Sequence, residues 1–330
     1  MAAYTTIDDP GAYFNTVLWT GNATTSTAIT GVGFQPDMTW IKERSQTRSH
    51  VLFDVVRGAT VQLNPNDSAS DATVAESLQS FDADGFTVGD ATSVNESGET
   101  YVGWNWKKTA DAGFDIVSYT GNDTARTIAH SLSAVPKVIM PKSRSDAYEW
   151  RLYHAGNTSA PETDFIVLNE NYATTDQANA WNDTAPTSSV FSLGTGETPN
   201  NDGTTYITYL WAEKQGYSKF SSFVGNGADD GIFCFTGHRP AMVLLKGTAD
   251  NREWIIFNNK TNTFNPIDSN LYPNGSSAEN TGTDRIDFLS NGFKLRDGAA
   301  NYNNSGDTYI YMSFAEAPFV NSNGVPCNAR

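Results

Sequence analysis

The chain has 330 residues, of which 18% are charged and 38% are hydrophobic, and its formal net charge is −16 at pH 7. So acidic a chain has no basic stripe with which to neutralise phosphate groups, which argues against binding nucleic acid or anionic lipid. It contains no run of about 18 apolar residues, and we expect no membrane-spanning helix. Its first residues lack the basic and apolar regions of a secretory signal peptide.

The composition predicts β structure. Gly, Asn, Thr and Ser are abundant and aromatic residues reach 12%, whereas Lys, Glu and Leu, which fill the surfaces of helices, are sparse. Short apolar runs bounded by Gly, Asn, Asp and Pro recur along the chain. This pattern is typical of antiparallel sandwiches and barrels.

Five landmarks follow one another in the first part of the chain and then recur twice. They are a Gly-Asn turn at 20–22, Pro36 before an apolar strand, Lys42 at the end of that strand, an apolar strand at 51–53, and a glycine turn leading into an aromatic strand at 97–106. The recurrences are 120–122, Pro136, Lys142, 151–153 and 202–211, and then 224–226, Pro240, Lys246, 255–257 and 305–314. Chance could produce one such match, but not five in the same order.

The period of roughly 100 residues is too long for a solenoid repeat and equals the usual size of a complete domain. We therefore predict an all-β protein of three tandem antiparallel β-sandwich domains, jelly-roll-like and sharing one topology. Their predicted ranges are residues 1–110, 111–215 and 216–330, and the last includes a C-terminal tail. The seams between them are short, which favours docked neighbours over freely moving ones.

Each copy ends in a strand whose two faces differ. Alternate residues of a strand point to opposite faces, and one face of these closing strands is large and apolar in all three copies. That face carries Val102, Trp104 and Trp106, then Ile207, Tyr209 and Trp211, then Ile310, Met312 and Phe314. We expect this face to anchor the core of each sandwich and the opposite face to be exposed or partly covered.

The C-terminal tail at 318–330 has little periodicity. Phe319, Val320 and Val325 nevertheless give it apolar side chains to bury, so we expect it to be ordered. Cys234 lies in an apolar run and should be a buried small residue, without a bridge to the second cysteine in the tail.

The first copy carries motifs that are weak singly and specific as a set. They are Trp19-Thr20-Gly21-Asn22, Gln35-Pro36-Asp37, Trp40-Ile41-Lys42-Glu43-Arg44, Phe53-Asp54-Val55-Val56-Arg57-Gly58 and Asp84-Gly85-Phe86. Over the whole chain, the sequence resembles tandem β-sandwich repeat domains of virion structural, tail-fibre-like proteins from tailed phages, many of them marine. The later copies depart from the motifs: Asp54 becomes His154 and then Asn258, and Arg57 has no obvious counterpart.

The resemblance implies a non-enzymatic protein on the surface of a bacteriophage particle, made in the host cytoplasm without a signal peptide. A tail-fibre or adhesin-type role in host recognition is the leading expectation, followed by capsid (head) decoration. The expected partners are other virion proteins, copies of the chain itself and a host surface glycan. The alternative from another class is a carbohydrate-binding module or a glycan-acting spike.

The three strand-end lysines, Lys42, Lys142 and Lys246, are candidate contacts for a ligand or partner. Lysine offers three donors at the end of a long flexible stem. The structural alternative, which we favour, is that each pairs with an internal carboxylate or stays in solvent and blunts a sheet edge.

Exposed aromatic rings would provide stacking platforms for sugars. Trp150 and Trp254 lie at corresponding positions of two copies, where the first copy has His50. Trp181 lies in a polar loop of the second copy alone and is the best candidate for an exposed ring.

We expect no catalytic residues, no metal site and no cofactor. The four histidines fall at different points of the repeat, and no serine elbow or Cys–His pair is evident. Any chain with 37 acidic residues offers carboxylate pairs of the kind that glycosidases use. The acidic stretch 82–90 resembles part of a calcium loop but lacks its alternating acids and final glutamate, so we expect a β-turn there.

Overall fold

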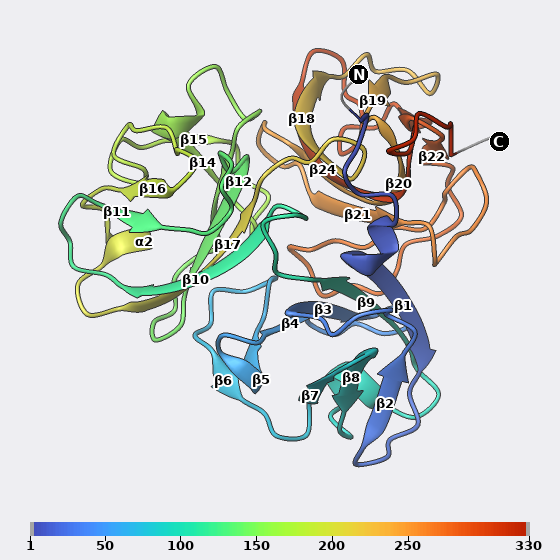
Figure 1. Ribbon diagram of the computed structural model, residues 1–330, viewed down its shortest axis with the longest axis horizontal. Coiled ribbons are helices and arrows are strands. Elements are labelled where there is room, and N and C mark those ends of the chain that lie inside the picture. The colour runs from blue at the N-terminus through green and yellow to red at the C-terminus, as the bar shows by residue number, and fades with distance from the viewer. Residues whose placement is uncertain (1–2, 328–330) are drawn as a thin grey trace.

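Figure 1 shows the computed structural model, which describes residues 3–327, as three lobes around a common centre. We name the lobes unit 1, unit 2 and unit 3 and use for them the residue ranges 1–110, 111–215 and 216–330. Each unit supplies one large sheet and one small sheet, and the strands within them pair antiparallel. The predicted all-β, antiparallel fold is confirmed.

The large sheets begin with the same strand order in all three units. In unit 1 the order is β1-β9-β3-β4-β5-β6, with β1 (Phe14–Thr20), β9 (Thr100–Trp106), β3 (Met38–Glu43), β4 (Val51–Asp54), β5 (Gly58–Leu63) and β6 (Ala72–Thr73). In unit 2 it is β10-β17-β12-β13-β14-β15, with β10 (Phe114–Thr120), β17 (Thr205–Trp211), β12 (Val138–Ser143), β13 (Arg151–His154), β14 (Asp164–Val167) and β15 (Thr175–Asp176). In unit 3 it is β18-β24-β20-β21, with β18 (Ser218–Val224), β24 (Thr308–Pro318), β20 (His238–Gly247) and β21 (Trp254–Asn258).

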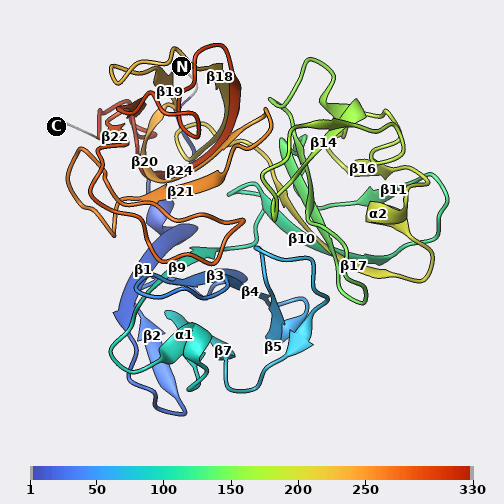
Figure 2. The same cartoon turned by 180° about the vertical axis from the view of Figure 1, so that it is seen from behind.

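The small sheets lie toward the outside of the lobes, as the two views in Figures 1 and 2 show for β2 and β22. They are β2-β8-β7 in unit 1, β11-β16 in unit 2 and β19-β23-β22 in unit 3, with β2 (Thr27–Thr30), β8 (Gly85–Val88), β7 (Leu78–Asp82), β11 (Arg126–Ala129), β16 (Val190–Leu193), β19 (Phe233–Phe235), β23 (Gly292–Leu295) and β22 (Ile286–Leu289). The helices are single turns: η1 (Pro10–Ala12), α1 (Thr92–Asn95), η2 (Pro161–Thr163) and α2 (Glu197–Asn200). Within residues 3–327, no helix has the length and apolar character needed to cross a bilayer.

The register of the large sheets is also shared. The corresponding cross-strand pairs are Met38 with Trp106, Val138 with Trp211, and Met242 with Phe314. Pro36 and Pro136 precede their strands, as expected, but β20 already begins at His238, before Pro240. The pairing shifts on either side of Pro240, because a proline without an N–H is tolerated within a sheet only at a bulge or an edge.

Glycine turns lead into the closing strands β9, β17 and β24. Gly98, Gly203 and Gly306 have φ values of 83°, 73° and 85°, which glycine adopts without the steric cost of a Cβ atom. A glycine therefore recurs at this point of each unit because the turn requires a positive φ, as the sequence predicts.

Each unit is a β-sandwich with a core between its large and small sheets. In unit 1, for example, Ile41 and Phe53 of the large sheet pack with Phe86 and Val88 of the small sheet. Units 2 and 3 have equivalent clusters of their own.

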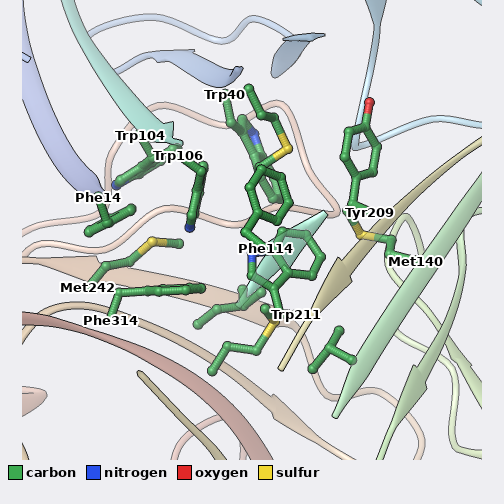
Figure 3. Close-up of a cluster of buried hydrophobic side chains, with 14 of the residues drawn as sticks. Phe14, Trp40, Trp104, Trp106, Phe114, Met140, Tyr209, Trp211, Met242 and Phe314 are labelled. Atoms are coloured by element: carbon green, nitrogen blue, oxygen red, sulfur yellow. The ribbon is translucent and has the colours of Figure 1, made fainter. Parts of the chain in front are cut away.

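A fourth core joins the three units at the centre (Figure 3). It includes the large apolar faces of the three closing strands, together with residues of the neighbouring strands such as Trp40, Met140 and Met242. Those faces carry Val102, Trp104, Trp106, Ile207, Tyr209, Trp211, Ile310, Met312 and Phe314. The prediction that each such face anchors the core of its own sandwich is wrong, because these faces point to the shared centre. The opposite faces, expected to be exposed or partly covered, are buried in the separate sandwich cores.

Aromatic rings make direct contacts across the units in this central core. The Trp106 ring lies 6.4 Å from the Trp211 ring and 5.6 Å from the Phe314 ring, centroid to centroid. Phe14 of unit 1 stacks on Phe314 of unit 3 at 5.0 Å. The space left at the centre is about 10 Å³, which is too small for more than one water molecule.

The C-terminal tail packs on unit 3 and on the beginning of the chain. The Phe319 N–H donates to the Gly237 carbonyl at 3.2 Å, and the Ser322 N–H donates to the Asp8 carboxylate at 2.7 Å. Val325 is 55% exposed, so it is not one of the buried anchors that we expected, and residues 328–330 lie outside the described residues. Cys234 is buried and unpaired, as expected.

Truncation of Phe314 tests whether the shared core makes the three units one cooperative body. We expect Phe314→Ala to lower the free energy of unfolding by about 3–5 kcal/mol, because it empties space that all three units line. Calorimetry should show one transition that moves as a whole to lower temperature. Phe264→Ala is the matched control, since that ring is 73% exposed, and should change stability by less than about 0.5 kcal/mol. Separate transitions, of which only one moves, would instead support three independently folding domains.

Candidate functional site

The three candidate lysines, Lys42, Lys142 and Lys246, end the equivalent strands β3, β12 and β20 and are fully buried. Their amino groups donate to main-chain carbonyls and not to the internal carboxylates that the sequence suggested. The acceptors are Glu43 and Gln46 for Lys42, Ser68 and Tyr148 for Lys142, and Tyr172 and Gly247 for Lys246. Burial excludes direct contact between these amino groups and an external ligand or partner, so both sequence-based interpretations of the lysines are corrected.

Two of these lysines bind a neighbouring unit. Lys142 of unit 2 holds the Ser68 carbonyl of unit 1 at 2.9 Å, and Lys246 of unit 3 holds the Tyr172 carbonyl of unit 2 at 3.0 Å. Burial lowers the pKa of Lys42 and Lys142 to about 8 and that of Lys246 to about 7, because removal from water penalises the charged amine. The contacts that Lys142 and Lys246 make with neighbouring units therefore contribute to stability in a way that depends on pH.

A second repeated position makes the same kind of contact. Trp150 donates its indole N–H to the carbonyls of Asn64 and Asp67 in unit 1, at 3.0 and 3.1 Å. Trp254 donates in the same way to Val167 of unit 2, at 2.8 Å. The corresponding residue of unit 1 is His50.

His50 continues the pattern from unit 1 to unit 3. Its Nε2 lies 3.0 Å from the Tyr272 carbonyl, and its Nδ1 accepts the indole N–H of Trp40 at 2.9 Å. Burial holds the pKa of His50 well below its usual value, so the ring is neutral and its Nε2 carries the proton. Trp150 thus links unit 2 to unit 1, Trp254 links unit 3 to unit 2, and His50 links unit 1 to unit 3.

Main-chain hydrogen bonds close the same ring. The N–H groups of Asp71, Thr174 and Glu279 donate to the carbonyls of Arg144, Thr248 and Arg44 at 2.9, 2.9 and 2.7 Å. Two of these contacts also carry an ion pair: Arg144 with Asp71 at 2.8 Å, and Arg44 with Glu279 at 2.6 Å. We call this set of contacts the interunit ring.

One polar cluster distinguishes the junction of units 1 and 2. Asp54 and Arg57 form an ion pair at 2.5 Å with both side chains inaccessible to solvent, and the Tyr209 hydroxyl of unit 2 donates to Asp54 at 2.7 Å. At the next junction His154, which replaces Asp54, lies 3.1 Å from the Tyr311 carbonyl of unit 3. Asp54 and His154, which differ between copies at this position, therefore both contact a neighbouring unit.

Trp181, the candidate exposed ring, is buried at 2% exposure, so that expectation is wrong. Its indole N–H donates to the Asp164 carbonyl at 2.9 Å, and its ring packs edge-on against Tyr153. The small sheet of unit 2 has two strands where the other units have three. The Trp181 loop takes the place of the missing strand and fills the core of that sandwich.

The acidic stretch at 82–90 forms a turn, as expected. Asp82 pairs with Gly85 in the β7–β8 hairpin, and the Asp84 carboxylate accepts the N–H groups of Gly31 and Gly33 at 3.1 and 2.6 Å. Among residues 3–327, no group of three or more His, Cys, Asp or Glu side chains is arranged to hold a metal ion.

Two of the hollows at the surface of residues 3–327 have polar linings. One of about 200 Å³ lies where units 1 and 3 meet and includes Asp9, Lys260 and Glu316 in its lining. The other, of about 300 Å³, lies on unit 3 and is lined by Pro266, Asp284, Asp287 and Arg296.

Two exposed rings of unit 3 were not anticipated. Phe233 and Phe235 of β19 are 43% and 55% exposed, and they lie on either side of the buried Cys234. In unit 1, the cross-strand register places Ala28 and Thr30 of β2 at the positions that Phe233 and Phe235 occupy in unit 3. Large rings at positions where another copy has small residues are the sequence signal that could have identified these two as exposed.

A family model described as "Domain of unknown function (DUF7483)" matches residues 9–318, a stretch that runs through all three units. The chain belongs to this family. No significant match was found among curated proteins.

The pH dependence of stability tests the role of the buried lysines. Each has a lower pKa folded than unfolded, so the unfolded chain binds more protons above pH 7 and the free energy of unfolding should rise from pH 7 to pH 9. Denaturant titrations of Lys246→Met should show a smaller slope over this range. Lys260→Met, which removes an exposed lysine of the same unit, should keep the wild-type slope. An unchanged slope in Lys246→Met would contradict the assignment.

The hydroxyl of Tyr209 provides a test of the junction between units 1 and 2. Tyr209→Phe removes the donor to the buried Asp54 carboxylate and should lower the free energy of unfolding by about 1.5–3 kcal/mol, the usual value for a hydrogen bond to a charged group. Tyr172→Phe makes the same change at a residue that is 50% exposed and should have little effect. Equal stability of both variants would show that the contact with Asp54 contributes nothing.

Proposed function

We propose that the chain is a non-enzymatic structural protein on the surface of a tailed-phage particle, with a tail-fibre or adhesin-type role in host recognition. Its partners would be other virion proteins, copies of itself and a host surface glycan. The resemblance of its motifs to tandem repeats of such proteins is the first support for this proposal.

The interunit ring is the structural observation that carries the proposal. It joins each unit to both others, and together with the central core it holds the three units against one another. A protein of a particle outside the cell cannot be refolded or replaced there, so it needs a high barrier to unfolding. Contacts between all three pairs of units, made by residues distant in sequence, suit such a role. The outer sheets and their loops stay at the surface, where they can contact a neighbour or a receptor.

The acidic surface is a second support. A net charge of −16 disfavours non-specific association with nucleic acid and with the anionic surfaces that surround a particle in the host cell. Specific contacts then depend on polar Asn- and Thr-rich loops and on a few exposed apolar side chains. This argument applies equally to a protein that decorates the head, which is the second candidate.

The position of the chain on the particle tests the proposal. Particles of a phage that encodes the chain are purified, their proteins are identified by mass spectrometry, and gold-labelled antibodies against the chain are imaged by electron microscopy. We expect the chain in the particle and the label on the tail; antibody pre-adsorbed with the purified chain is the control. Label on the head would replace the tail role by head decoration, and absence of the chain from particles would overturn the proposal.

A further inference from the structure

The outer face of the small sheet in unit 3 differs from the corresponding faces of the other units. Cross-strand pairing places Phe235 opposite Gly292 in unit 3 and Thr30 opposite Gly85 in unit 1, so these positions are equivalent. By the same register, Phe233 corresponds to Ala28. In unit 2 the equivalent residues are Thr127 and Ala129. Only unit 3 carries large rings at these two points of its edge strand.

These rings are not needed by the sandwich beneath them. Cys234, which lies between them, points inward and joins the core of unit 3. Phe233 and Phe235 point outward on the same side of β19, because alternate residues of a strand share a face. Exposed apolar groups gathered on one surface mark binding sites more often than single exposed residues do.

A row of charged side chains continues from the rings across the sheet. Phe233 lies opposite Lys294 of β23, and Lys294 lies opposite Asp287 of β22. Lys294 also pairs with Asp230 at 2.8 Å, and Arg296 pairs with Asp287 at 2.5 Å. The face therefore changes from apolar rings at its edge to fixed donors and acceptors at its far side.

The hollow of about 300 Å³ opens at this polar side. Its volume falls at the lower end of the range for small-molecule sites, and Asp284, Asp287 and Arg296 supply hydrogen-bonding groups to its lining. Phe264, two residues before Pro266 in that lining, is 73% exposed and is the most exposed of the large apolar residues described. Phe264 is therefore near the hollow along the chain, and Phe233 lies two strands from Asp287 in its lining.

We propose that this face of unit 3 binds a carbohydrate chain of neutral sugars, a refinement that rests on the host-recognition role proposed above. A sugar ring has an apolar C–H face that packs against an aromatic ring and a rim of hydroxyls that both donate and accept hydrogen bonds. Arg296 can donate to such hydroxyls and Asp287 can accept from them while the two side chains keep their ion pair. With strands about 4.8 Å apart, Phe233 and Asp287 are separated by about 10 Å, so an oligosaccharide is needed to contact both.

The charges of the face decide against an acidic ligand. Lys294 and Arg296 are outnumbered by Asp230, Asp284 and Asp287, and both cations are already paired. A carboxylated or sulfated sugar would meet excess negative charge there, whereas a neutral sugar would not.

A glycan array carrying neutral and acidic bacterial-type oligosaccharides, followed by calorimetric titration of the best-bound member, tests the proposal on the full chain. We expect binding to neutral members. The double variant Phe233→Ala/Phe235→Thr, which installs the residues of unit 1, should bind at least tenfold more weakly, and Arg296→Gln should also lose affinity. Leu18→Ala, at an exposed apolar residue of unit 1, is the matched control and should bind within twofold of the wild type.

Thermal unfolding of each variant first establishes that it folds like the wild type. Absence of binding to any neutral member, preference for acidic members, or full affinity in the double variant would each overturn the proposal. Concentration-dependent self-association abolished by the double variant would assign the face to a second copy of the chain instead. None of these results bears on whether the chain is present in the particle, so the host-recognition role and this site can fail separately.

Discussion

The structure depends on the apolar faces of three closing strands meeting at one centre. Trp106, Trp211 and Phe314 stand at the same register position of β9, β17 and β24, and Trp106 contacts the other two. Because these faces leave their own sandwiches and pack on each other, both faces of each closing strand are buried. Burial of a large side chain contributes roughly 1.5–3 kcal/mol. The closing strands contribute nine such side chains to the central core, so this core holds the units together far more strongly than their short linking segments could.

Because the three units pack closely at the centre, polar groups at the contacts between the units are buried away from water. The buried lysines, Trp150, Trp254 and His50 meet this requirement by donating to main-chain carbonyls, several of them in a neighbouring unit. Such hydrogen bonds add modest net stability, but leaving one partner without the other is costly, so they favour one relative placement of the units. The differences between copies at Asp54 and His154 then make the junctions distinguishable and the order of the units unique.

The small outer sheets do not line the central core, and they differ between the copies. Unit 2 lacks one strand and fills the space with the Trp181 loop, whereas unit 3 exposes two phenylalanines where the other units have small residues. A body whose interior keeps three equivalent positions can therefore vary its surface in one unit without disturbing the rest. The recognition role proposed above would use such a variable surface.

The sequence by itself determined the elements that depend on neighbours along the chain. The all-β class, the glycine turns before the closing strands and the inward position of Cys234 all follow from backbone geometry and from alternation along a strand. What covers a face depends on segments that are distant in sequence. The apolar faces of the closing strands could equally have lined separate sandwiches. Nothing in the sequence near Lys142 reveals that one of its two acceptors is the Ser68 carbonyl of another unit.

Only the tertiary structure decided which rings are buried and which are exposed. Trp181 lies in a polar loop but packs into the core of unit 2, whose small sheet has two strands instead of three. Phe233 and Phe235 lie in an apolar run, yet they are 43% and 55% exposed on the outer side of their sheet. The alternation of side chains along a strand shows which residues share a face, but only the packing of the whole chain determines which face is buried.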